Sequence, residues 1–92
     1  MHVKVTEEHI AKGKRRAMSF CPIALAIKEQ ASNSHVDVMP RHVYIGLGDD
    51  TRICDLPQIA HDFVVAFDMG NDVHPFEFET ECRRLYAREE GR

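Results

Sequence analysis

The stretch VDVMPRHVYIGLGDDTRIC, residues 36–54, decides the fold of this chain. Apolar side chains alternate with polar or small ones along most of it, which is the period of half-buried strands. The pattern predicts three strands, Val36–Met39, Val43–Leu47 and Thr51–Cys54. Pro40-Arg41 separates the first two, and Gly48-Asp49-Asp50 has the composition of a hairpin turn. Because links this short join neighbouring strands, the three strands should form an antiparallel meander.

One strand and two helices are expected before the meander. His2–Val5 alternates like a short strand, and Thr6 is the expected N-cap of a short helix that ends near Gly13. Pro22 has the preferred first-turn position of a second helix. The apolar stripe of this second helix comprises Phe20, Ile23, Ala24, Ile27 and Ala31.

A third helix and a last strand are expected after the meander. Pro57 marks the start of the helix, and Gly70 is its expected stop. The apolar stripe of this helix comprises Leu56, Ile59, Ala60, Phe63, Val64 and Phe67. Two phenylalanines then alternate with two glutamates over residues 76–79, which is typical of a strand.

The element order β-α-α-β-β-β-α-β predicts an α+β fold. The simplest burial is an antiparallel four- to five-stranded sheet with the two main helices packed on one face. The chain has 92 residues, enough for one domain, which we place at residues 1–80. Residues 81–92 are highly charged and are expected to form a tail or a short helix.

Composition favours a soluble globular protein. The chain is 43 % apolar and 29 % charged, too apolar for a disordered protein. Its longest apolar stretch, Cys21–Ile27, is well short of the ~20 residues that a membrane-spanning helix needs. The first residues also lack the basic-then-apolar layout of a signal peptide. We therefore expect a cytosolic protein without membrane contact.

Charge is unevenly distributed along the chain. Residues 1–48 hold seven Lys or Arg against four acids, whereas residues 49–92 hold five Arg against eleven acids. The halves therefore carry +3 and −6, which gives the net −3 of the whole chain. This asymmetry indicates either two kinds of partner surface or two halves that folding interleaves.

Nothing in the sequence predicts an enzyme or a metal site. Cys21, Cys54 and Cys82 are odd in number and lack a Cys-x-x-Cys pair, so we expect three reduced thiols. The six histidines and three cysteines have no zinc-like spacing, and no cofactor or metal is expected. Cys21 before a helix could be a reactive thiol, but a buried structural cysteine is the favoured interpretation. We name no catalytic residue.

The densest positive run is Lys12, Lys14, Arg15 and Arg16. Such a cluster on a connector can engage phosphates or an acidic protein groove, and a solvated turn is the alternative. Direct binding to duplex DNA is disfavoured, since the whole protein is acidic and the second helix offers only Lys28 as a cation.

The sequence resembles a family of small phage and prophage proteins. The residues that carry the resemblance are Val3-Lys4-Val5-Thr6-Glu7-Glu8-His9-Ile10-x-x-Gly13, Cys21-Pro22-Ile23-Ala24-Leu25-Ala26-Ile27, Phe63-x-x-x-Phe67-Asp68-x-Gly70 and Val73-x-Pro75-Phe76-x-Phe78. Within that family it is most similar to anti-CRISPR inhibitors of the type I-F surveillance (Csy) complex. The resemblance implies a monomeric, non-enzymatic protein in the host bacterial cytoplasm, which takes no small-molecule substrate. It would dock on the Cas backbone subunits, with the guide RNA as a further contact, and prevent target DNA from pairing with the guide.

Candidate partner-binding residues follow from charge. The cations expected to approach guide RNA are Lys12, Lys14, Arg15, Arg16, Lys28 and Arg41. The acids expected to pair with Lys and Arg of the DNA channel are Asp49, Asp50, Glu77 and Glu79. Two alternatives stay open: a small phage DNA-binding or regulatory protein acting on transcription or a host factor, and a small enzyme with Cys21 as nucleophile.

Overall fold

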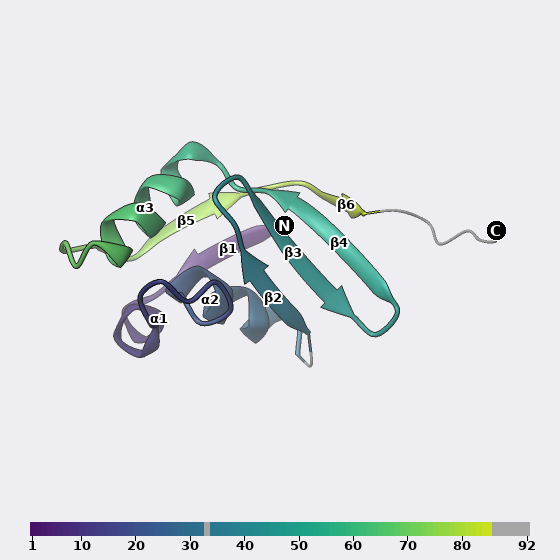
Figure 1. Cartoon of the computed structure of the whole chain (residues 1–92), viewed down its shortest axis with the longest axis horizontal. Coiled ribbons are helices and arrows are strands. Elements are labelled where there is room, and N and C mark those ends of the chain that lie inside the picture. The colour runs from purple at the N-terminus through teal and green to yellow at the C-terminus, as the bar shows by residue number, and fades with distance from the viewer. Residues whose placement is uncertain (33, 86–92) are drawn as a thin grey trace.

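The computed structural model describes residues 1–32 and 34–85 and shows an α+β fold (Figure 1). The elements are β1 (His2–Val5), α1 (Glu7–Lys12), α2 (Pro22–Gln30), β2 (His35–Val38), β3 (His42–Leu47), β4 (Asp50–Asp55), α3 (Gln58–Asp68), β5 (Phe76–Glu79) and β6 (Cys82–Arg84). This order confirms the predicted fold class and element order, with β6 as an addition. The expectation of a tail or helix at residues 81–92 is wrong for residues 82–84, and residues 86–92 lie outside the described part.

The strands form two antiparallel sheets instead of the single sheet expected. One has the order β2-β3-β4-β6, and the other pairs β1 with β5. The predicted meander is present, with Val43 opposite Val38 in β2 and opposite Cys54 in β4. The chain passes from one sheet to the other between β5 and β6, which follow one another closely (Figure 1).

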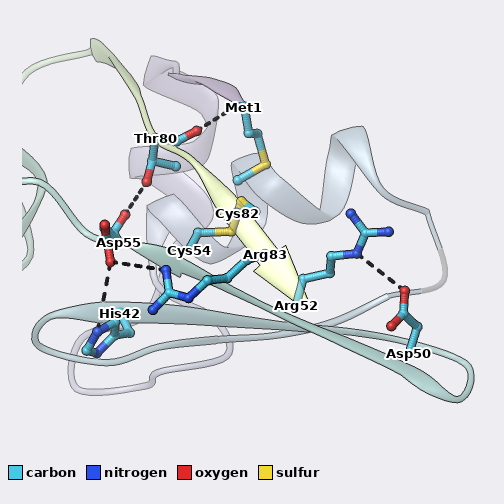
Figure 2. Close-up of a disulfide and its surroundings, with 9 residues drawn as sticks. All are labelled: Met1, His42, Asp50, Arg52, Cys54, Asp55, Thr80, Cys82 and Arg83. Atoms are coloured by element: carbon cyan, nitrogen blue, oxygen red, sulfur yellow. Dashed lines mark hydrogen bonds and ion pairs between the residues drawn. A yellow bond between two sulfur atoms is a disulfide. The ribbon is translucent and has the colours of Figure 1, made fainter. Parts of the chain in front are cut away.

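Thr80 fastens the two sheets together at this crossing. Its backbone N–H donates to the Met1 carbonyl at 2.9 Å, and its hydroxyl donates to the Asp55 carbonyl at 2.5 Å. Figure 2 shows both partners on opposite sides of Thr80. The buried hydroxyl thus satisfies a backbone carbonyl of β4 while the main chain pairs with the N-terminus. Thr80 thus bonds to the N-terminal residue beside β1 and to β4, and it lies where the chain leaves the sheet of β5 and enters the sheet of β6.

Local sequence explains where the first two helices begin. The Thr6 hydroxyl accepts from the His9 backbone N–H, and the Thr6 backbone N–H donates to His9 Nδ1 at 2.9 Å. His9 therefore takes the place that Glu or Gln has in a capping box. Pro22 follows the N-cap Cys21 of α2, as expected. Gly13 has to be glycine, because a Cβ there would lie 2.6 Å from Cδ of Pro22.

One core joins the two sheets to α2 and α3. The largest fully buried side chains are Ile23, Ile27, Val3, Val5, Val36, Val43, Pro22 and Cys54. In α3, Phe63 stacks on Phe76 of β5 with ring centroids 4.6 Å apart. Two predicted core residues lie outside: Phe20 is 51 % exposed and Ile59 is 57 % exposed. Phe20 precedes α2 instead of belonging to it, and Ile59 lies in the first turn of α3.

The expectation of three reduced thiols is wrong for two of them. Cys54 of β4 and Cys82 of β6 lie directly opposite one another and form a disulfide (Figure 2). The sequence could not reveal this pairing because 28 residues separate the two cysteines and only the strand register brings them together. Cys21 is the free cysteine and is buried.

None of the helices within the described residues is long and apolar enough to cross a membrane.

Candidate functional site

The connector between α1 and α2, residues 14–20, is a closed loop that holds most of the predicted cationic cluster. The Lys14 N–H donates to the Phe20 carbonyl at 2.8 Å, and the Phe20 N–H donates to the Ala17 carbonyl at 3.0 Å. Arg16 has a left-handed backbone with a φ of 56°, which is uncommon for a residue other than glycine. The chain therefore folds back on itself tightly enough to bring residues 14 and 20 together. We call residues 14–20 the basic loop.

Three further bonds fasten the basic loop to β2 and α3. The Val38 N–H donates to the Met18 carbonyl at 2.9 Å, and the Ser19 hydroxyl donates to Asp37 at 2.5 Å. On the other side, the Arg16 N–H donates to Asp68 Oδ1 at 2.9 Å. A loop held at both flanks loses little conformational entropy when it binds a partner. The loop is therefore a preorganised surface.

Phe20 lies on this surface near two ammonium groups. Lys28 Nζ, from α2, lies 4.3 Å from the centroid of the ring, and Lys14 Nζ lies 6.0 Å from it. The Lys28 ammonium also donates to the Ser19 carbonyl at 2.5 Å, which fixes it beside the ring. Cations over an aromatic face are attracted by its quadrupole. The result is an exposed aromatic ring with positive charge on its flanks.

The cations of this region, like Lys4 and Arg41, make no ion pair with acids of the described residues, whereas four other cations do. Across residues 1–32 and 34–85, the side chains of Lys14, Arg15, Arg16 and Lys28 make no ion pair. By contrast, acids of the same chain neutralise the cations Lys12, Arg52, Arg83 and Arg84. As far as the described residues go, these four positive charges stay available to a partner.

Lys12 and Arg15 each have a local role as well. Lys12 bonds to Glu8 at 2.9 Å, and this bond raises the pKa of Lys12 and lowers that of Glu8. Arg15 lies against the glycine that ends α3: a Cβ at Gly70 would be 3.4 Å from Arg15 Cζ. A cation at a helix C-terminus is favoured by the helix dipole. Because Glu8 already pairs with its charge, Lys12 is the predicted cation that we expect to contribute least to partner binding.

Arg41 lines the far part of a groove that begins at the basic loop. Arg16, Met18 and Cys21 line a pocket with a volume of about 290 Å³, and Arg41 lines a second one of about 400 Å³. The two pockets adjoin, since both are lined by Pro40, Leu56 and His61. The basic loop and Arg41 are thus on one continuous face.

The predicted acidic contacts lie apart from the basic loop. Asp49 and Asp50 are at the β3–β4 turn, on the opposite side of the view from α1 and the loop beside it (Figure 1). Asp50 is engaged by Arg52 at 3.3 Å and by Arg84 at 3.1 Å. Glu77 and Glu79 are engaged by His2. Only Asp49 has no such partner within the described residues.

Cys21 and His9 are buried and lie outside the candidate surface. Cys21 is 3 % exposed, and burial raises the pKa of its thiol despite its position at the start of α2. In the part of the chain that the structure describes, no group of three or more His, Cys, Asp or Glu is arranged to hold a metal ion. The buried His9 accepts from Thr6 at Nδ1 and donates from Nε2 to Glu29 at 2.8 Å. This pattern fixes its tautomer and its place in the fold.

Comparisons with protein-family models, with curated proteins and with solved structures each found no match. Inferences about function therefore rest on the chain itself. The sequence identified the cations of the basic loop but placed Phe20 in the core. The signal that it lies outside was the position of Pro22, which starts the helix two residues later.

His2 forms a pH-dependent clamp between β1 and β5. Its Nε2 lies 2.7 Å from Glu77 and its Nδ1 lies 2.7 Å from Glu79, so both ring nitrogens can donate only when the imidazole is charged. The hydrogen bonds to Glu79 and Glu77 raise the pKa of His2 above its ordinary 6.5. The clamp therefore contributes stability below about pH 6.5, and this contribution is lost as pH rises through the folded-state pKa.

We expect the urea midpoint of the protein to fall more between about pH 5.5 and about pH 8.5 than that of the variant His2→Asn. Lys4, exposed on the same strand and without an ion pair in the described residues, gives a control, Lys4→Asn. A pH dependence that His2→Asn leaves unchanged would exclude the clamp.

Proposed function

We propose that this protein is a non-enzymatic phage inhibitor that binds the guide-RNA-loaded type I-F surveillance complex and sterically blocks hybridisation of target DNA. One observation supports this most: two cations without ion pairs in the described residues, Lys14 and Lys28, lie beside the exposed Phe20, and two more, Arg15 and Arg16, belong to the same basic loop. The resemblance to phage inhibitors names the partner, and the basic loop supplies chemistry suited to a partner that contains RNA.

The loop suits a ribonucleoprotein better than it suits naked duplex DNA. The protein as a whole carries a net charge of −3, so a long polyanion lying across it would meet repulsion beyond the loop. A guide RNA held in a protein channel exposes a limited length of phosphate. The channel walls are positively charged and would attract the acidic second half, including Asp49 at the β3–β4 turn. The protein then acts as a monomer without a cofactor, in the host bacterial cytoplasm.

A gel-shift experiment tests the proposal. Purified guide-loaded type I-F complex is incubated with the protein, labelled target duplex is added, and the complex–DNA band is measured. We expect this band to disappear with increasing protein, while the protein alone leaves the duplex unshifted.

Target binding that persists at saturating protein would overturn the blocking mechanism. A shift of naked duplex by the protein alone would favour a DNA-binding regulator instead. The salt dependence of that shift would then report the number of phosphates contacted.

A further inference from the structure

We propose that Phe20 is a stacking platform for an unpaired RNA base, and that Lys14 and Lys28 hold the phosphates beside that base. This inference rests on the proposed function, in which the guide RNA supplies the unpaired base. It assigns a role to the ring itself, which charge attraction to a ribonucleoprotein would not require.

The exposure of Phe20 is the first argument. An apolar ring on a loop gains nothing from water, and the core already includes Phe63 and Phe78 as buried rings. Phe20 is nevertheless held at the surface by two backbone hydrogen bonds, to Lys14 and to Ala17. Lys28 Nζ lies over one face of the ring, so a base, which has a flat π-face, would stack on the other face, and this kind of stacking tolerates any base sequence.

The position of the cations is the second argument. Lys28 is tied to the Ser19 carbonyl and lies 4.3 Å from the ring centroid, so its charge is fixed at the ring. Lys14 lies on the same ring at 6.0 Å. A base stacked on Phe20 would bring its own phosphates within reach of these two ammonium groups. Ring and cations together match the combination by which proteins bind single strands.

The combination favours single-stranded RNA over other anionic partners. Bases of a duplex stack on one another and do not offer a free face to a side chain on the outside of the helix. An acidic protein segment would use the lysines but would leave the ring uncovered. Proteins that bind single-stranded RNA stack its unpaired bases on aromatic side chains, and this stacking does not depend on a particular base sequence.

A tryptophan probe tests the contact directly. The chain has no tryptophan, so Phe20→Trp introduces a single fluorophore at the site. Ile59→Trp places the fluorophore at an exposed position of α3 as a matched control. We expect a short oligouridylate to quench the fluorescence of Phe20→Trp and not that of Ile59→Trp. Inorganic polyphosphate, which has charge but no base, should quench neither.

Affinity variants complete the test. We expect Phe20→Leu to weaken binding of oligouridylate roughly tenfold and Phe20→Tyr to retain it, since Tyr keeps the ring. A urea titration confirms that each variant folds. Equal affinity of Phe20→Leu and the unaltered protein would overturn the inference, as would equal quenching of the two tryptophan variants.

The gel shift on the surveillance complex separates the two proposals. If the unaltered protein blocks target DNA and Phe20→Leu blocks it equally well, the stacking platform is wrong and the proposed function stands. If the unaltered protein fails to block target DNA, the proposed function is wrong. If Phe20→Leu blocks target DNA more weakly than the unaltered protein does, and Phe20→Tyr blocks it equally well, both proposals are supported.

Discussion

Replacing Lys14, Arg15 and Arg16 together by Glu is expected to abolish the block of target DNA in the gel shift. Each side chain without an ion pair in the described residues can release counterions from one phosphate, and each contact to single-stranded nucleic acid adds about 0.7 to the salt slope. Losing three such contacts should lower the affinity for the guide-loaded complex by roughly 100-fold and the salt slope by about 2. Affinity measured at several salt concentrations gives both values.

Charge reversal has a structural cost that a second variant isolates. Arg15 lies at the C-terminal end of α3, and the Arg16 backbone bonds to Asp68, so new carboxylates there meet unfavourable fields. The triple variant with Gln removes the positive charges without adding negative ones. We expect it to show most of the loss in affinity while its urea midpoint stays close to that of the unaltered protein.

A single exchange provides the matched control. Lys4→Glu changes net charge as much as Arg15→Glu does, but Lys4 lies on β1 and is not part of the basic loop. We expect Arg15→Glu to weaken binding and Lys4→Glu to leave it unchanged. Equal losses for the two would mean that net charge, and not the loop, sets the affinity. An unchanged affinity in both triple variants would remove the basic loop from the binding surface.

The meander and the helix starts could be predicted from sequence because each depends on neighbours along the chain. Alternation between residues 36 and 54 and the prolines at 22 and 57 are local signals. The structure places β2, β3, β4, α2 and α3 within about two residues of the expected bounds. The N-cap of α1 at Thr6 could be predicted from local sequence in the same way. The cations of the basic loop were visible for the same reason, since three of them are consecutive.

Features that depend on distant contacts could not be predicted. The short strand Cys82–Arg84 carries no alternation long enough to detect, and it is a strand because β4 pairs with it. The same pairing creates the disulfide. Lys28 was predicted as a binding cation from its charge, but its place beside the Phe20 ring follows from the packing of α2 against the loop and could not be predicted. Sequence distance hides such relations even where every residue type is known.

Reduction of the Cys54–Cys82 disulfide is expected to lower the free energy of unfolding by about 3–4 kcal/mol, given that 28 residues separate the two cysteines. The bond is a large part of the attachment of β6, which pairs with β4 over only three residues. Urea titrations with and without a dithiol reductant give the difference. Thiol titration of the unfolded protein should find one thiol before reduction, that of Cys21, and three after it.

The double variant Cys54→Ala/Cys82→Ala provides the control, because its urea midpoint should not respond to the reductant. A midpoint of the unaltered protein that the reductant leaves unchanged would contradict the assigned role of the bond. The binding function should respond differently. The basic loop is fastened to Val38 and Asp37 of β2 and to Asp68 of α3, and not to β6. We therefore expect the reduced protein, while folded, to block target DNA as well as the oxidised one, which the proposed action in a reducing cytoplasm requires.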